Sequence, residues 1–176
     1  FKGAISSSTI DFGADSDSVT FSVAATSTTI LGGTGADTLV FSSGANLVTS
    51  SVSGGTDGDS LVFSAVVKSA TSIAGGGGND TMVFNSSVGG AFVSLDSGAD
   101  SVSFVTKVSG ATMHGGNGAQ TVAFSSASDL VTFNGSFAGG SINGGSGNDS
   151  LVFSSDVNGT SISGGAGDDT ISGSIS

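Results

Sequence analysis

The chain has 176 residues, including 31 Gly and 12 Phe but no Pro, Trp, Tyr or Cys. Three Lys+Arg against fourteen Asp+Glu give a formal net charge of −11, which argues against nucleic acid and anionic membranes as partners, because both are bound by clustered cationic side chains. No apolar run approaches the ~18 residues that a membrane helix needs, so we expect no membrane insertion. A mean hydropathy of +0.32 argues against a disordered linker.

A glycine-aspartate motif recurs along the chain. Four copies read Gly-Gly-x-Gly-x-Asp, then Ser or Thr, then an apolar residue, and they lie at 32–39, 75–82, 144–151 and 164–171. Weaker copies lie at 12–19, 54–61, 95–102 and 115–122, and the last of these has Gln120 in place of the acid. Taking the sixth motif residue as the reference, successive copies are 20, 22, 21, 20, 20, 29 and 20 residues apart. A repeat of this length indicates a solenoid.

Apolar residues occupy fixed positions around the reference residue. The positions seven before and two after it are apolar in all eight copies. The position four after it is Phe in seven copies: Phe21, Phe41, Phe63, Phe84, Phe104, Phe124 and Phe153. Apolar residues at +2 and +4 are typical of a strand with one buried face. The sequence therefore predicts an all-β, right-handed parallel β-solenoid, with about eight coils of ~20 residues and an internal Phe ladder.

Two further features bear on the fold: the interval of 29 residues between the reference residues 120 and 149, and the residues at +1 and +3, which strand alternation directs outward. We interpret the chain as one domain over 1–176, with the extra residues forming an insertion loop within 125–141. The residue after the reference is Ser or Thr in all eight copies, so strand alternation predicts an outward column of hydroxyls. Valines at +3, including Val40, Val62 and Val83, would form an outward apolar stripe suited to association.

The segments GGTGADTLV, GGGGNDTMV, GGSGNDSLV and GGAGDDTIS resemble the repeats-in-toxin nonapeptide of secreted bacterial proteins and adhesins. In that family Ca²⁺ lies between consecutive turns, held by Asp carboxylates and backbone carbonyls. The resemblance implies calcium ligands along one outer corner of the solenoid. They are Asp37, Asp59, Asp80, Asp100, Asp149 and Asp169. Alternatively, these side chains only accept hydrogen bonds from turn amides.

The sequence offers little for catalysis, because it has no Glu, Cys or Arg and a single histidine. We therefore expect a structural protein, not an enzyme: a calcium-stabilised subunit or segment of an extracellular or cell-surface fibre, surface layer or matrix, which associates with itself end to end. An adhesin or ice-binding segment is one alternative. A secretion or folding module of a larger secreted enzyme is another, and it follows from the family resemblance.

Overall fold

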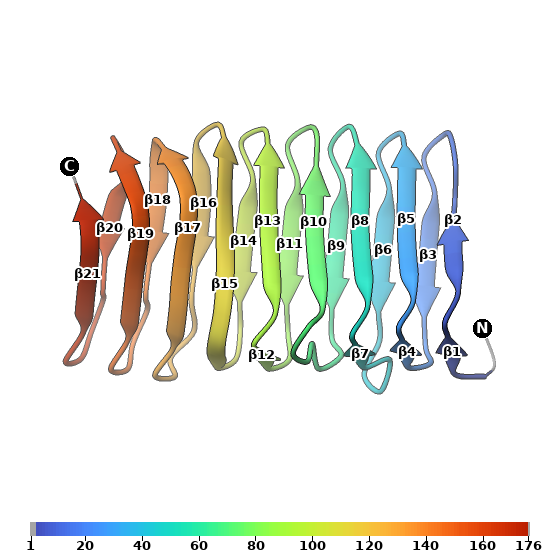
Figure 1. The fold of residues 1–176 in the computed structure, drawn as a ribbon, viewed down its shortest axis with the longest axis horizontal. Helices are drawn as coiled ribbons and strands as arrows, with labels where there is room; N and C mark the ends of the chain where they lie inside the picture. The colour runs from blue at the N-terminus through green and yellow to red at the C-terminus, as the bar shows by residue number, and fades with distance from the viewer. Residues whose placement is uncertain (1–2, 176) are drawn as a thin grey trace.

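The computed structural model describes residues 3–175. In this part of the chain 21 strands form a parallel β-solenoid of about eight coils (Figure 1). The same residues contain no helix. A search for a helix able to cross a membrane accordingly found none among these residues. The predicted all-β solenoid is confirmed.

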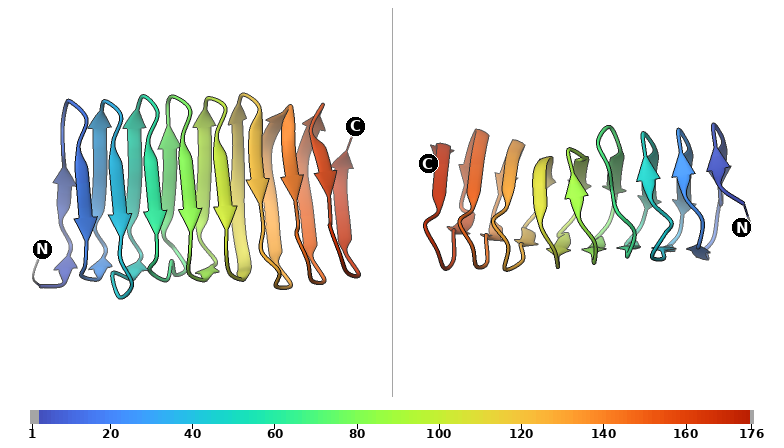
Figure 2. Two further views of the ribbon diagram at one scale, coloured as in Figure 1. Left: turned by 180° about the vertical axis from the view of Figure 1, so that it is seen from behind. Right: turned by 90° about the horizontal axis from the view of Figure 1, so that it is seen from below.

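Two long sheets form the flat faces of the solenoid, and short strands line one edge (Figure 2). The ten-stranded sheet contains β2 (Thr9–Asp11), β5 (Thr29–Thr34), β8 (Ser51–Thr56), β10 (Ser72–Gly76), β13 (Phe92–Ser97), β15 (Val108–Asn117), β17 (Leu130–Ala138), β19 (Ser150–Asn158), β21 (Thr170–Ile175) and, beside β15, β12 (Val88–Gly89). The eight-stranded sheet contains β3 (Ser18–Phe21), β6 (Thr38–Phe41), β9 (Ser60–Phe63), β11 (Thr81–Phe84), β14 (Ser101–Phe104), β16 (Gln120–Ala123), β18 (Gly140–Asn143) and β20 (Ser161–Ser163). The three-stranded sheet contains β1 (Ile5–Ser6), β4 (Ala25–Thr26) and β7 (Leu47–Val48).

The path of the chain gives the hand of the solenoid. In Figure 1 the strands of the ten-stranded sheet lie nearer the viewer and point up, and those of the eight-stranded sheet lie behind and point down. The chain advances from right to left in this view. A path that rises in front and descends behind while moving left is right-handed, as predicted.

The core consists of side chains stacked in register from coil to coil. Each Phe at +4 pairs with its equivalent on the next strand, as in Phe41↔Phe63 and Phe63↔Phe84. The rings from Phe21 to Phe124 form one continuous stack, with centroids 4.7–5.0 Å apart and planes within 11° of parallel. This spacing equals the ~4.8 Å between parallel strands, so strand pairing and ring stacking support the same register.

The expected insertion loop within 125–141 is wrong, because this segment contains β17 and the first residues of β18. Val122 pairs with Ile142, one regular coil of 20 residues later, and Val131 pairs with Leu151. The interval of 29 residues is therefore one coil plus nine residues, and nine residues are about half a coil. The offset moves the motif from the eight-stranded to the ten-stranded sheet without interrupting the stack.

This half-coil offset divides the predicted ladders into two parts. Phe124 meets Phe133 edge-on, with centroids 6.2 Å apart and planes at 87°, and Phe133 then stacks on Phe153 at 4.7 Å. Phe153 thus belongs to a second stack on the opposite sheet. The motif turns lie along the upper edge of Figure 1 up to β16 and along the lower edge before β19 and β21.

Candidate functional site

The reference residues of the motif form two columns, which we name the first and second acidic columns. The first contains Asp17, Asp37, Asp59, Asp80, Asp100 and Gln120, and the second contains Asp129, Asp149 and Asp169. Each member lies at the start of a strand, where a motif turn ends. The columns follow from the stacking of equivalent turns, so the sequence period places the carboxyl groups one above another.

Each side chain in the columns other than that of Asp17 links its coil to the preceding one. The backbone N–H of Asp37 donates to Oδ1 of Asp59 at 2.8 Å, and the N–H of Asp59 donates to Oδ1 of Asp80 at 2.8 Å. The same bond recurs along both columns, at 2.6–3.0 Å, with Oε1 of Gln120 and Oδ1 of Asp129 as acceptors at two of the rungs. The columns therefore continue the parallel ladder through a turn that would otherwise leave these amides unpaired.

The second oxygen of most of these carboxyl groups is sealed inside the solenoid. Oδ2 of Asp37, Asp59, Asp80, Asp100 and Asp149 is buried and has no hydrogen-bond partner among the described residues. A Cβ added at Gly32 would lie 2.5 Å from Oδ2 of Asp37. The first glycine of the motif thus leaves room for the carboxyl group of its own coil.

Burial and like charge act together on the ionisation of the first column. Desolvation is the largest cause that raises the pKa of Asp80 to about 7; a hydrogen bond from the Asp59 amide lowers this pKa, and the like charges of Asp100, Asp59 and Asp96 add to the rise. Desolvation also raises the pKa of Asp59, Asp100, Asp129 and Asp149. These five carboxyl groups therefore favour the protonated form more than ordinary aspartates do.

The structure places the six predicted ligands in two groups instead of one. Asp37, Asp59, Asp80 and Asp100 belong to the first column, whereas Asp149 and Asp169 lie at the opposite edge. Sequence reasoning missed Asp129, because the turn before it, SSAS, contains no glycine. Its signals were present: Asp149 follows 20 residues later, and Val131 and Phe133 occupy the +2 and +4 positions.

The predicted outer corner of carboxylates is wrong, because the side chains turn inward. Asp37, Asp80 and Asp100 are each 1% exposed, and one oxygen of each already accepts an amide hydrogen bond. Ca²⁺ takes six to eight oxygen ligands. Among the described residues, no three His, Cys, Asp or Glu side chains are grouped as metal ligands. This arrangement does not fit the exposed site between turns that the family resemblance implies, and calcium binding stays a prediction.

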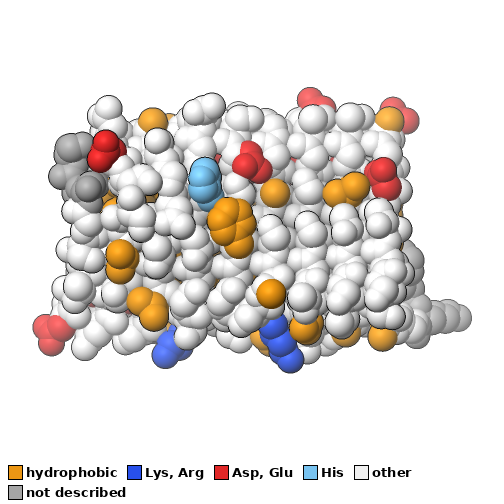
Figure 3. Space-filling view, in the orientation of Figure 1, with side chains coloured by type: hydrophobic (Ala, Val, Ile, Leu, Met, Phe, Trp, Pro, Cys, Tyr) orange, Lys and Arg blue, Asp and Glu red, His pale blue; other side chains and the backbone are white. Residues whose placement is uncertain are grey.

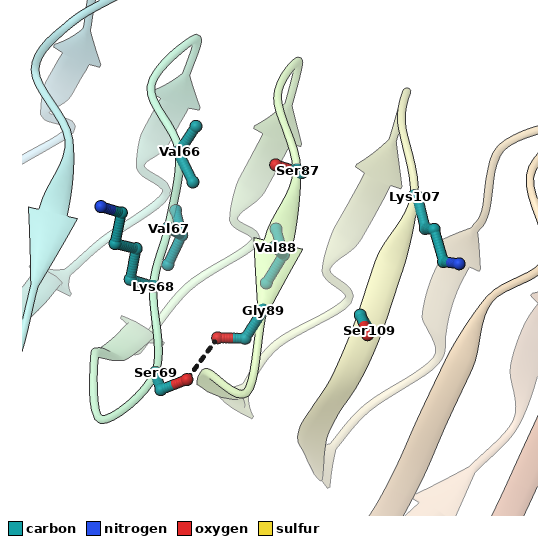
Figure 4. A pocket seen from close by; sticks show the side chains of 9 residues that line it. All are labelled: Val66, Val67, Lys68, Ser69, Ser87, Val88, Gly89, Lys107 and Ser109. Carbon is teal, nitrogen blue, oxygen red and sulfur yellow. Dashed lines mark hydrogen bonds between the residues drawn. The ribbon is translucent and has the colours of Figure 1, made fainter.

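A groove of about 340 Å³ lies at the lower edge of the ten-stranded sheet, beside β12 (Figure 4). Lys68 and Lys107, the two lysines within the described residues, line it together with valine and serine side chains. Figure 3 shows blue Lys or Arg side chains along this edge of the molecule. Figure 4 shows that their side chains point away from each other, so the groove does not bring the two ammonium groups together.

Comparisons of this chain with protein-family models, with curated proteins and with solved structures found no match.

Proposed function

We propose that this chain is a structural protein, a subunit or segment of an extracellular or cell-surface rod that grows by adding coils end to end. The observation that carries the proposal is the pair of open sheet edges. Among the described strands, β2 and β3 at one end and β20 and β21 at the other have a neighbouring strand on one side only. Unpaired edges of parallel strands are templates for further strands. A second copy or a further coil of a longer chain would meet the same edges.

The surface chemistry supports the same proposal. Ile171 occupies the +2 position, which is fully buried in the inner coils, as Leu61 and Met82 illustrate. In the last described coil Ile171 is 37% exposed, and among the described strands β21 has a neighbour, β19, on one side only. An end that combines free backbone groups with exposed core side chains favours stacking over exposure to water.

Calcium stabilisation is not needed for this proposal, since the amide bonds of the acidic columns already connect the coils. The adhesin, ice-binding and secretion-module alternatives stay predictions. A flat hydroxyl column of eight rungs, as ice binding would use, is interrupted by the half-coil offset: Ser150 and Thr170 lie on the ten-stranded sheet, whereas Thr121 and its predecessors lie on the eight-stranded sheet.

The test is to block one edge without disturbing the coil behind it. The N–H of Thr170 donates to the carbonyl of Asp149 at 2.7 Å, so by the alternation of a parallel ladder the N–H of Ile171 faces the open edge. Ile171→Pro removes that donor and places a ring on the edge. We expect the native chain to form rods that lengthen with concentration in sedimentation velocity and negative-stain microscopy. Ile171→Pro should give single short rods with an unchanged far-ultraviolet circular dichroism spectrum.

The matched control is Ile171→Val, which keeps the backbone N–H and a branched apolar side chain. It should assemble as the native chain does. The proposal fails if the native chain stays monomeric at millimolar concentration, or if Ile171→Pro assembles as well as Ile171→Val.

A further inference from the structure

The outer face of the eight-stranded sheet carries no charge. Within their described bounds its strands, from β3 to β20, contain no Asp, Glu, Lys, Arg or His. The reference aspartates precede these strands, but Asp37, Asp59, Asp80 and Asp100 are buried inside the solenoid. The exposed part of the formal net charge of −11 therefore lies on the turns, the edges and the opposite sheet.

The side chains on this face are short and regularly placed. Strand alternation directs the +1 and +3 residues outward, and in β6 these residues, Thr38 and Val40, are half-buried while the residues after each of them are buried. Every +1 and +3 residue on the sheet is Ser, Thr, Val, Ala or Asn. The left view of Figure 2 shows the strands of this sheet lying nearly parallel. The face is therefore flat and has no projecting side chain.

An apolar stripe lies on the same face. Val40 pairs with Val62, and Val62 pairs with Val83, so three valines follow one another on neighbouring strands. Val105 directly follows β14 and is 55% exposed, and its N–H donates to the carbonyl of Phe84 at 2.9 Å. Aligned exposed valines favour contact with another apolar surface over contact with water.

The outer face of the ten-stranded sheet is different. It includes Asp11 in β2, Asp96 in β13 and His114 in β15. Phe92 in β13 is 39% exposed, and its ring centroid lies 6.2 Å from that of His114. Figure 3 shows acidic, histidine and hydrophobic side chains on this side of the molecule. Charged and projecting side chains hinder the close approach of a second flat sheet.

We infer that the outer face of the eight-stranded sheet packs against the same face of a second copy of this chain. The described strands offer no cation there for an anionic ligand and no carboxylate for a cationic one. A second copy has the same ~4.8 Å spacing between strands and the same short side chains, so the two faces can interdigitate along the whole sheet. Contact through any other face would bring negative charges together.

Hydroxyl groups do not prevent this contact. Each Ser or Thr hydroxyl can donate one hydrogen bond and accept others, so the +1 residues of one copy can pair with those of the other. Thr38, Ser60 and Thr81 are such residues beside the valine stripe. The interface would therefore combine an apolar stripe with polar groups that have partners across it.

The area of the face determines the strength of the contact. Eight strands at ~4.8 Å cover about 35 Å along the solenoid, and four residues per strand cover about 14 Å across it. Two copies would bury about 1,000 Å² in total, at the lower end of specific interfaces. A single pair should therefore associate weakly. Rods that repeat the face should pair side by side more strongly, because successive contacts add up.

Val62→Glu tests the inference, because it places a carboxylate in the middle of the valine stripe. Ser72→Glu is the matched control: it adds the same charge to β10, half-buried on the opposite face. Sedimentation equilibrium in the Ile171→Pro background measures lateral association without rod growth. We expect Val62→Glu to raise the dimer dissociation constant at least about tenfold, since like charges would meet in the interface. Ser72→Glu should leave this constant unchanged, and both variants should keep the native circular dichroism spectrum.

Ser103→Val tests the same surface by strengthening it. Ser103 pairs with Val83, so the substitution extends the valine stripe by one strand. Burial of the added methyl groups should lower the dimer dissociation constant about tenfold. A constant that does not fall would contradict packing through this face, even if Val62→Glu were to disturb the fold.

Salt dependence distinguishes this face from the lysine edge. Because the face is uncharged and each copy carries a net charge of −11, salt screens the repulsion and should strengthen the association. Contact between Lys68 or Lys107 and aspartates of another copy would weaken with salt. Dimers that dissociate between about 0.05 M and about 0.5 M NaCl would overturn the inference.

Negative-stain images separate this inference from end-to-end growth, which leaves the face free. Paired native rods that become single rods in Val62→Glu, but not in Ser72→Glu, would support both. Native rods that stay single would overturn the lateral contact and leave end-to-end growth standing. Lateral dimers without rods would overturn end-to-end growth and leave the lateral contact standing.

Discussion

Most buried aspartates in the columns exchange hydration for one hydrogen bond that they accept from a backbone amide. For Asp80 that bond comes from the Asp59 N–H at 2.8 Å, while the other oxygen remains without a partner. Leaving a buried polar atom unpaired costs about 1–3 kcal/mol. Gln120 shows a neutral solution at the same position of the motif: its Oε1 accepts from the Asp100 N–H at 2.9 Å, and its Nε2 donates to the Gly98 carbonyl at 3.1 Å. A neutral side chain at this position therefore accepts the amide hydrogen bond and also gives its second polar atom a partner.

The raised pKa of Asp80 predicts that the solenoid is most stable in acid. Its folded-state pKa of about 7 lies above the ordinary 3.8, so between these values the folded chain binds more protons than the unfolded chain. The free energy of unfolding should therefore be highest below pH 4, should fall as the pH rises towards 7, and should level off above it. The difference between 3.8 and about 7 corresponds to about 4 kcal/mol, and screening by solvent reduces it, so we expect a loss of about 2 kcal/mol, measured by urea denaturation from pH 4 to pH 8.

Asp80→Asn is the variant that isolates this effect, because it keeps an acceptor oxygen for the Asp59 amide and removes the charge, as Gln120 does naturally. The fall in stability between pH 4 and 7 should become shallower in this variant. Exposed Asp156→Asn should leave the profile as it is in the native chain. A native profile that rises from pH 4 to 7 would contradict the raised pKa.

At the scale of the turn, the motif glycines meet two separate requirements. Gly33 has φ of 114°, and a Cβ added to it would overlap the carbonyl oxygen of Gly13 one coil away. Gly44 also has positive φ, 92°, but a Cβ there would meet no atom within 4 Å. The two positions therefore separate the cost of backbone conformation from the cost of a blocked contact between coils.

We predict that Gly44→Ala lowers the free energy of unfolding by about 1 kcal/mol, the cost of a left-handed residue with a Cβ. Gly33→Ala adds overlap with the stacked backbone and should cost about 3 kcal/mol or more. Denaturation curves of both variants, compared with the native chain, measure the difference. Equal losses at the two positions would mean that the coils can separate enough to admit a methyl group.

The strands and their register could be predicted because alternation and period agree at every rung. Apolar residues at +2 and +4 define a buried face, and repetition after about 20 residues stacks these faces, so Phe41, Phe63 and Phe84 were expected in one stack. The inward direction of the carboxyl groups could not be predicted. It depends on the space left by Gly32 and its equivalents, and a sequence pattern shows glycine spacing but not which atom occupies the space.

At the scale of the whole molecule, the half-coil offset was invisible to an alignment that follows the glycines. Asp129 has no glycine in its turn, so nine residues were interpreted as excess and assigned to a loop. Each coil has one strand in each long sheet, and the strand that follows the motif can lie in either sheet. The nine residues therefore need no loop. The offset moves the motif strand to the other sheet while the strand ladder continues, as the pairs Val122↔Ile142 and Val131↔Leu151 show.

Calcium dependence is also a property of the whole stack, because a metal between turns would act at every rung. The buried, amide-bonded carboxyl groups lead us to expect that the urea midpoint at pH 7 is the same with 5 mM CaCl₂ as with excess EDTA. Magnesium chloride at equal ionic strength controls for screening of the net charge of −11. A rise of the midpoint with calcium alone, lost in Asp80→Asn, would show that the inward columns open to admit the ion. That result would support the calcium stabilisation implied by the repeats-in-toxin resemblance. It would contradict our expectation that calcium leaves the stability unchanged.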